Sequence, residues 1–356
     1  MKLYLHIGTE KTGSSYLQTL CAINRGTLIE NGCYFPTAGK REKDMLGGRI
    51  SPGNADELSE LIHTNSWKEV QNWLRERKEV AEKHKCSTLL LSNEILNRRL
   101  SVAGTLENFH SAARECGINS IKILLYIREP SDHALSLYRH RMKNGITKGF
   151  SDWLKHSYQL PVELADLFKA FEKLRRNTTV DVTVRKYSSK GNFMMNSFFD
   201  DWAGINSGEL MLPESKVVNP SLNLSELLFL SALKTQKKGY EHYMYSYFTR
   251  NSTDMKADES ELINTFKRKA VVYLNSFSTE VDKMNSYLPE NEKLSAYRFN
   301  QNEIVTNSGF DARFSEAQLA SITSFIKYST SLKFKLNFMW SNNIKPVLRS
   351  FKRKLQ

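Results

Sequence analysis

The sequence is poor in cysteine, and its cysteines follow no recognised pattern. Only 4 cysteines occur among 356 residues, and they form no CxxC pair and no spacing typical of a zinc site. This scarcity excludes a disulfide-stapled or zinc-ribbon protein and suits a reducing compartment. We therefore expect reduced thiols and no bound metal.

Long apolar runs are also lacking. No segment approaches the roughly 18 consecutive apolar residues that a membrane-spanning helix needs. A strand-like segment begins at Lys2, which leaves no room for a secretory leader before it. Together these absences favour a cytoplasmic protein without a transmembrane anchor.

Acidic residues are fewer than basic ones: the sequence has 38 aspartates and glutamates and 51 lysines and arginines, which gives a net charge of +13. Such an excess can attract nucleic acid, anionic membranes or acidic ligands. No nucleic-acid-binding motif accompanies it, so we expect no nucleic-acid partner. The most basic stretch is the tail over 341–356, which ends in KPVLRSFKRKLQ. We expect it to be solvated; the alternative is peripheral contact with an anionic surface such as the inner membrane.

The segment over 2–20 combines a strand, a loop with two glycines and the start of a helix. It reads KLYLHIGTEKTGSSYLQTL. The apolar KLYLHI predicts a buried strand, and SYLQTL begins a run of apolar residues at helical spacing, which predicts a helix over 13–30. A strand that turns through glycines into a helix directs backbone N–H groups and the positive end of the helix dipole to one place. Phosphate or sulfate binds well there; an unliganded turn is the alternative.

The position of the lysine separates this loop from that of nucleotide triphosphatases. Their P-loops read GxxxxGK[ST], with the lysine directly after the second glycine. Here Gly8 and Gly13 keep the glycine spacing, but Ser14 follows the second glycine and the lysine is Lys11. The loop therefore keeps the glycine spacing of a backbone anion site, but its lysine lies two residues before the second glycine. The expected anion-binding residues of the loop are Lys11, Thr12, Gly13, Ser14 and Ser15.

A second predicted strand is followed by an arginine and then by a serine. The strand covers 121–127 and reads IKILLYI; Arg128 follows it, and Ser136 lies about two turns into a helix that Pro130 can begin. Ligands of open α/β sheets bind beyond the carboxyl ends of the strands, so Arg128 and the loop should share one edge. Arginine can bind a phosphate with two hydrogen bonds. The alternative for Arg128 is a surface ion pair.

These two elements resemble those of sulfotransferases that use 3′-phosphoadenosine-5′-phosphosulfate (PAPS). The KTGSS loop is similar to their 5′-phosphosulfate loop, and Arg128 with Ser136 is similar to their 3′-phosphate element. STLLLSNE over 87–94 and NPSLNLSELLFLSAL over 219–233 are looser likenesses. The resemblance implies transfer of a sulfuryl group from PAPS to a hydroxyl or amine of a saccharide or glycolipid. The product would be adenosine 3′,5′-bisphosphate (PAP), and no metal would be needed.

The resemblance also implies roles for single residues. Lys11 would stabilise the leaving phosphate. Glu94, at the end of a predicted strand, is the first candidate for the general base, and Glu10 in the loop is the second. Arg185 ends the strand-like DVTVR; it would reach the adenosine or form an ion pair.

Two histidines are weaker candidates for the base. His6 lies inside a predicted strand, where burial is the expected state. His133 lies near a helix start, where we expect it at the surface or beside the cofactor. Either would take the role if both carboxylates proved dispensable.

Predicted strands alternate with predicted helices along the first half of the chain. The pattern predicts an α/β fold: a P-loop-like, mostly parallel sheet flanked by helices, with a mainly helical C-terminal part. The predicted strands cover 3–8, 87–92, 121–127 and 179–185. We expect a single sulfotransferase-like domain over 1–356, comprising an α/β nucleotide-binding core (1–205), a mainly helical acceptor-side region (206–340) and the basic tail.

Two other function classes fit parts of the sequence. A P-loop kinase or another nucleotide-binding protein would use the same loop, although Ser14 stands at its lysine position and no predicted strand ends in a clear magnesium-binding aspartate. A non-catalytic protein that binds anionic ligands would use the basic surface alone. Magnesium-dependent ATP binding would indicate the kinase, and metal-independent PAP binding would indicate the sulfotransferase.

Overall fold

The computed structural model divides into two compact units, and neither unit is continuous in sequence. The sheet unit comprises Met1–Ala134, Ser157–Asn219 and Val271–Asn300, and the helical unit comprises Leu135–His156, Pro220–Ala270 and Gln301–Gln356. Three borders fall inside helices, namely α8 (Pro130–Lys143), α9 (Phe150–Ser157) and α14 (Ser260–Leu274). The structure describes residues 1–48, 51–143, 148–174, 179–213, 222–236, 239–250, 258–295, 314–331, 334–335 and 338.

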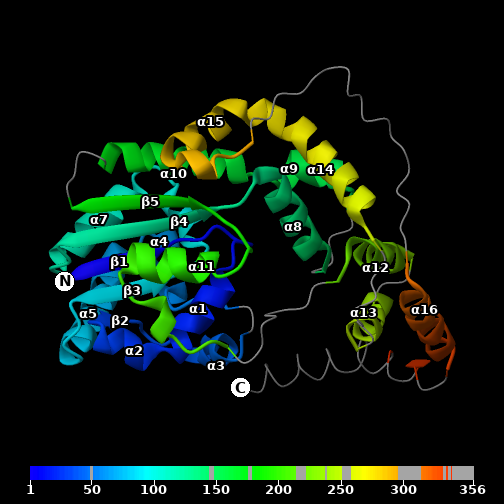
Figure 1. Ribbon diagram of the computed structural model, residues 1–356, viewed down its shortest axis with the longest axis horizontal. Helices are drawn as coiled ribbons and strands as arrows, with labels where there is room; N and C mark the ends of the chain where they lie inside the picture. The colour runs from blue at the N-terminus through cyan, green and yellow to red at the C-terminus, as the bar shows by residue number, and fades with distance from the viewer. Residues whose placement is uncertain are drawn as a thin grey trace. The chain divides into compact units, whose positions relative to one another are not determined.

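The sheet unit is built on five parallel strands in the order β2–β3–β1–β4–β5, which Figure 1 shows side by side. In register, Leu5 of β1 lies between Leu91 of β3 and Ile123 of β4, and all three side chains are buried. Strands covered on both faces read as continuous apolar runs, which is why β3 and most of β4 do not alternate, whereas the edge strand β5 does. The predicted α/β fold with a parallel sheet is confirmed. The strands are β1 (Lys2–His6), β2 (Cys33–Tyr34), β3 (Thr88–Ser92), β4 (Ser120–Ile127) and β5 (Val180–Lys186).

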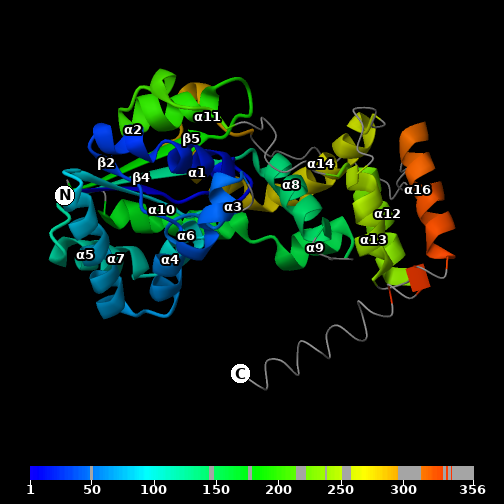
Figure 2. The same ribbon diagram turned by 90° about the horizontal axis from the view of Figure 1, so that it is seen from below.

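Helices cover both faces of this sheet. In Figure 2, α2 and α11 lie on one side of the strands, and α5, α7 and α10 lie on the other. The helices of the sheet unit are α1 (Ser14–Ile23), α2 (Arg25–Glu30), α3 (Glu42–Leu46), α4 (Asp56–His63), α5 (Trp67–Lys83), α6 (Leu96–Leu100), α7 (Thr105–Glu115), α10 (Leu160–Leu174), α11 (Phe193–Asn196) and α15 (Ser278–Tyr287).

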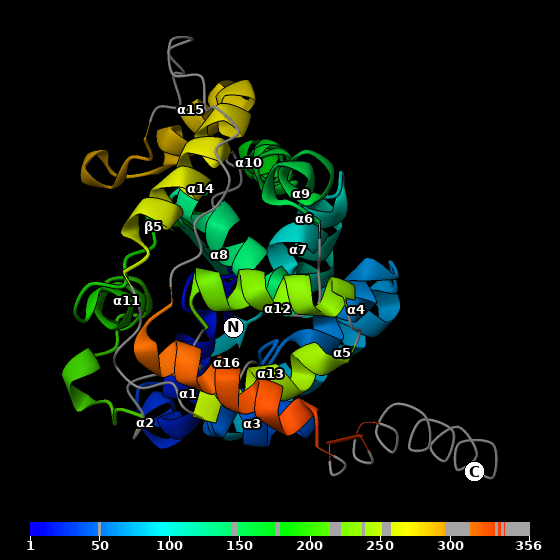
Figure 3. The same cartoon turned by 90° about the vertical axis from the view of Figure 1, so that its right-hand side faces the viewer.

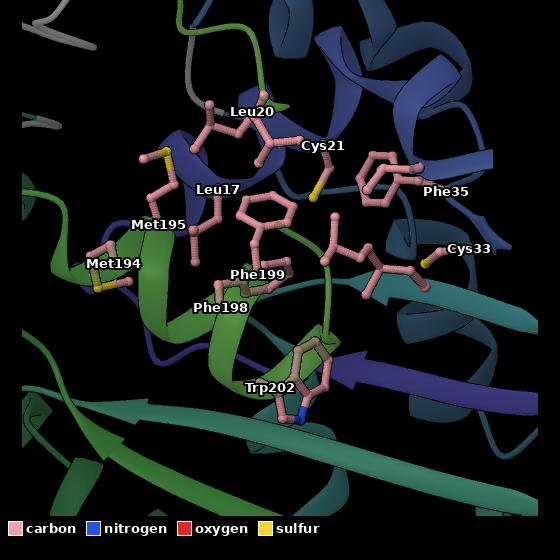
Figure 4. Close-up of a cluster of buried hydrophobic side chains, with 14 of the residues drawn as sticks. Leu17, Leu20, Cys21, Cys33, Phe35, Met194, Met195, Phe198, Phe199 and Trp202 are labelled. Carbon is pink, nitrogen blue, oxygen red and sulfur yellow. The ribbon is translucent and has the colours of Figure 1, made fainter. Parts of the chain in front are cut away.

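A buried apolar cluster fixes α1 on its face of the sheet. Leu17 and Leu20 of α1 meet Phe198 and Phe199, which follow α11, and Trp202 completes the layer (Figure 4). Burial of a leucine or phenylalanine side chain is worth about 1.5–3 kcal/mol. This packing fixes the direction of α1, and therefore the place to which its N-terminus points.

Sequence periodicity predicted one helix over 13–30, and this prediction is wrong at Asn24. The Asn24 side-chain amide donates to the carbonyl of Leu20 and to that of Met211, both at 2.9 Å. Its carbonyl oxygen Oδ1 accepts from the N–H of Met211 at 2.7 Å. The asparagine therefore bonds to a distant segment, and the chain starts a new helix, α2, at Arg25.

The strand order places the loop after β1 at a topological switch point. From β1 the chain runs toward β2 at one edge, whereas from β3 it crosses past β1 to β4 and then to β5 at the other edge. Connections that diverge in this way leave space at the carboxyl ends of the strands, where open α/β sheets bind their ligands. The loop after β1 lies there, with the end of β3 on one side and the end of β4 on the other.

The helical unit confirms the mainly helical C-terminal part. Figure 3 shows α12, α13 and α16 near one another, and aromatic rings join α13 to the chain around α16. The Tyr240 ring lies 4.7 Å from that of Phe334, and the Tyr247 ring lies 5.7 Å from that of Phe325. Its complete helices are α12 (Leu224–Gln236), α13 (Tyr240–Arg250) and α16 (Glu316–Ser329), and it also contains α9 (Phe150–Ser157) except for the last residue. The predicted basic tail over 341–356 lies outside the described residues.

Candidate anion-binding site

The loop between β1 and α1 is held to the neighbouring strand by backbone hydrogen bonds. The Thr9 N–H donates to the Tyr126 carbonyl at 2.9 Å, and the Tyr126 N–H donates to the Gly8 carbonyl at 2.8 Å. The Thr12 hydroxyl closes the loop by donating to the Thr9 carbonyl at 2.5 Å. The backbone then turns at Lys11 and Gly13, whose φ values are 64° and 78°. Thr12 is thus placed in the loop as expected, with its hydroxyl used inside it.

The loop ends in backbone N–H groups without acceptors. Within the described part of the chain, no acceptor is found for the N–H groups of Thr12, Gly13, Ser14 and Ser15. Gly13 is the residue before α1, no side chain caps that helix start, and its first turn carries no acidic residue. Unsatisfied N–H groups and the positive end of the helix dipole make such a terminus suited to an anion.

Glu94 borders the loop on the β3 side. The Ser14 hydroxyl donates to its Oε2 at 2.5 Å. The close approach depends on Gly8, because a Cβ atom there would lie only 2.8 Å from the Cα of Glu94. Burial raises the pKa of the Glu94 carboxyl, and the Glu10 carboxylate adds to that effect, whereas the Ser14 hydrogen bond and the nearby Lys11 lower it.

Glu10, the second base candidate, has an arginine partner that sequence reasoning missed. Arg98 of α6 contacts the Glu10 carboxylate at 3.1 Å through Nη2 and donates from Nε to Glu163 at 2.9 Å. The signal was present, since Arg98 lies one helical turn after Glu94 in the sequence SNEILNRR. Only the fold shows that it turns to Glu10.

Asn54 is a second residue that sequence reasoning missed. Its side chain continues the sheet beyond the short β2: Nδ2 donates to the Leu90 carbonyl at 3.1 Å, and Oδ1 accepts from the Ser92 N–H at 2.8 Å. It therefore holds the end of β3, from which Glu94 projects. Nothing in the glycine-containing segment around residue 54 indicated this role.

Arg128 borders the loop on the β4 side, as expected. Its Nη1 donates to the Lys11 carbonyl at 3.3 Å, and its guanidinium carbon lies 5.5 Å from the centre of the Tyr187 ring. Tyr187, which follows β5, also lies against the loop, because a Cβ at Gly13 would be 3.2 Å from its ring. The sequence offered no reason to select Tyr187. Ser136 lies in the part of α8 that belongs to the helical unit, so its pairing with Arg128 stays a prediction.

Arg185 was expected either to form an ion pair or to reach the adenosine, and the structure shows ion pairs. Its Nε donates to Glu292 at 2.8 Å, and its Nη1 donates to Asp201 at 3.1 Å. The guanidinium carbon also lies 5.5 Å from the centre of the Phe193 ring. Contact of Arg185 with an adenosine stays a prediction.

The two histidines are buried and neutral. His6 is buried as expected, and its Nδ1 lies 2.9 Å from the Ser92 hydroxyl. His133 is not at the surface, which was one of its two expected positions, because it is only 1% exposed. Its Nε2 lies 3.0 Å from the Glu10 carbonyl, which can only accept, so Nε2 carries the proton and Nδ1 accepts from Tyr158. Burial lowers the pKa of both imidazoles to about 3.

The arrangement can bind a phosphate or sulfate group through backbone N–H groups, with the cations Lys11 and Arg128 beside it. No group of three or more His, Cys, Asp or Glu side chains that could hold a metal occurs among the described residues, and no described helix could cross a membrane. No family model, curated protein or solved structure matches this chain significantly.

Proposed function

We propose that this chain is a PAPS-dependent sulfotransferase whose cofactor loop is the turn between β1 and α1. The observation that supports this best is the run of unpaired backbone N–H groups over 12–15, with Lys11 in the loop and Arg128 bonded to the loop backbone. An open helix N-terminus, preceded by a loop that contains a lysine and contacts an arginine, suits a ligand that carries several phosphate or sulfate groups. A cytoplasmic location belongs to the same proposal.

Sulfuryl transfer needs alignment, neutralisation of the leaving group and a base for the acceptor proton. The backbone N–H groups of the loop would hold the 5′-phosphate of PAPS. Lys11 would neutralise the charge that develops on the leaving phosphate. Arg128, with Ser136, would bind the 3′-phosphate. The base is one of the two carboxylates that border the loop, Glu94 or Glu10.

The acceptor class rests on the family resemblance alone. It is a hydroxyl or amine, in a saccharide or glycolipid. A screen of such acceptors with PAPS labelled in its sulfuryl group would identify it. Transfer of label to an acceptor, with release of PAP, is the expected result.

A P-loop kinase would use the same loop, so ligand binding must separate the two functions. Calorimetric titrations with PAP, AMP and ATP, each with magnesium and with EDTA, make the comparison. The sulfotransferase predicts that PAP binds equally well in EDTA and more tightly than AMP. Magnesium-dependent ATP binding without PAP binding would replace the proposal by the kinase. Binding of all anions with a steep salt dependence and no saturation would indicate a non-catalytic protein.

A further inference from the structure

A single hydroxyl hydrogen at the loop has two competing acceptors. Ser14 is the first residue of α1, and its hydroxyl donates to Oε2 of Glu94. Its backbone N–H belongs to the group without acceptors, so an anion bound at this helix start would lie beside the same side chain. A serine hydroxyl has one hydrogen, and ionised carboxylates, phosphates and sulfates can only accept. Ser14 therefore cannot donate to both Glu94 and the anion while Glu94 is charged.

We infer that a phosphate or sulfate group binding at this loop brings a proton onto Glu94. The protonated Glu94 then donates to the Ser14 oxygen, and the Ser14 hydroxyl donates to the anion. The proton comes from the solvent, and no covalent bond changes besides the new O–H bond of Glu94. The inference rests on the proposed anion site and adds a role for Glu94 in it.

The surroundings of Glu94 favour this proton uptake. Each neighbouring element contributes a group that faces it: Ser14 from α1, Glu10 and Lys11 from the loop, and Arg98 from α6. Arg98 is already shared with two other carboxylates, those of Glu10 and Glu163. A bound anion would accept the Ser14 hydrogen bond and attract Lys11, both of which now stabilise the charged form of Glu94. It would also place a further negative charge near Glu94. All three changes favour the protonated carboxyl.

The inference also bears on the choice of base. A protonated Glu94 cannot accept a proton from the acceptor hydroxyl. Glu94 would then be a positioning residue for Ser14, and Glu10, which forms an ion pair with Arg98, would remain as the candidate base.

Proton uptake on binding tests the inference directly. Inorganic sulfate, which does not titrate near neutral pH, is added to saturation in a weakly buffered solution, and the pH change is recorded. PAP is tested in the same way above the second pKa of phosphate, which is about 6. The wild-type protein should take up protons, and its affinity should fall as the pH rises, by at most about tenfold per pH unit for one linked proton. Glu94→Gln should bind sulfate with no uptake and with an affinity independent of pH.

Two serine variants give a matched pair. Ser14→Ala should still bind sulfate through the backbone and should take up fewer protons. Ser111→Ala removes an exposed serine hydroxyl of α7 that donates to the Glu107 carbonyl, and this variant should keep the full uptake. Unchanged melting temperatures would show that all three variants are folded.

The outcomes separate the two proposals. Sulfate or PAP binding without proton uptake, or equal uptake by Glu94→Gln, would overturn the inference. Sulfate binding with uptake but without PAP binding would support the inference and remove the sulfotransferase. No binding of either anion would overturn the anion site itself and both proposals with it.

Discussion

The sheet unit and the helical unit hold their parts together by different means. In the sheet unit, backbone ladders join the strands and continue into the loop, where the Ile7 N–H donates to the Leu124 carbonyl at 3.0 Å. In the described part of the helical unit, side chains make the contacts between helices, such as the hydrogen bond from Gln318 to Glu226 at 2.8 Å. Backbone ladders do not depend on side-chain identity, whereas side-chain packing depends on each residue. The candidate site thus lies at the end of a backbone ladder, in the loop that continues from β1.

The two units also bury different chemistry. Both units enclose aromatic rings, but the buried histidines among the described residues, His6 and His133, lie in the sheet unit. A buried neutral imidazole can take up a proton in acid, whereas phenylalanine does not titrate and tyrosine ordinarily titrates only near pH 10. Acid should therefore distinguish the units, and so should deletion of a single ring.

Acid should destabilise the sheet unit most. His6 and His133 have a pKa of about 3 when folded and 6.5 when unfolded, so the unfolded chain binds more protons below pH 6.5. Their contribution to the free energy of unfolding is complete above pH 6.5. It is lost as the pH falls toward 3, at about 1.4 kcal/mol per histidine for each pH unit. Hydrogen exchange at pH 7.5 and pH 5.5 should show greater opening of β1 and α8 at the lower pH. A slope that His6→Gln and His133→Gln leave unchanged would assign acid sensitivity elsewhere.

Removing a buried ring should affect the helical unit alone. Phe325 is 3% exposed and contacts the rings of Tyr240 and Tyr247. Phe325→Ala should lower the free energy of unfolding by about 3–5 kcal/mol, because it removes buried apolar surface and leaves a cavity. The neighbouring Ile326 is 56% exposed, so Ile326→Ala is the matched control and should cost little. Exchange should rise in α13 and α16 and stay constant in β1 and β4; a rise in both units would end the distinction between them.

Lys11 tests whether the loop of the sheet unit carries the chemistry. Lys11→Ala should lower sulfuryl transfer about 100- to 1000-fold, the effect of removing one group that stabilises transition-state charge. Stability should hardly change, because the loop backbone bonds do not involve the lysine side chain. Lys169→Ala removes an exposed lysine of α10 that pairs with Asp166, and it should turn over normally. A folded Lys11→Ala protein with normal turnover would remove Lys11 from the mechanism.

Glycines show how closely the loop and the end of β3 approach. Gly8 has a φ of 92°, and a Cβ there would meet the Glu94 backbone at 2.8 Å. Gly8→Ala should lower the free energy of unfolding by about 1–3 kcal/mol, because it adds backbone strain and this clash. A Cβ at Gly26 in α2 would enter open space, with no neighbouring atom within 4 Å, so Gly26→Ala should be neutral or stabilise by up to about 1 kcal/mol. Urea midpoints of the two variants compare them; equal midpoints would show that the loop can shift freely.

Arg128 should give a selective effect on binding. A charge-assisted contact contributes about 1.5–3 kcal/mol, so Arg128→Ala should weaken PAP binding at least about tenfold and leave AMP binding nearly unchanged. Calorimetry with both ligands measures the difference. Equal losses would mean that Arg128, through its bond to the Lys11 carbonyl, supports the loop and does not read the 3′-phosphate.

Strands and loop were predictable because their signals are local. The long strands β1, β3 and β4 are apolar runs, and glycine with a following helical period marks the turn into α1. β2 was missed because two residues are too few to show a period. The break at Asn24 was missed because its cause, a bond to Met211, lies far away in sequence.

By itself, the sequence determined the parallel α/β class and the glycine-containing turn from β1 into the start of α1, since apolar period, glycine position and helix start act within a few residues. Only the tertiary structure decided which side chains meet there. Strand order brings Glu94 to Ser14, and helix packing brings Arg98 to Glu10 and buries His133 beside the loop. These pairs are separated by 80 or more residues in the chain. They exist because the carboxyl ends of parallel strands meet at one edge, and no local pattern encodes the order of those strands.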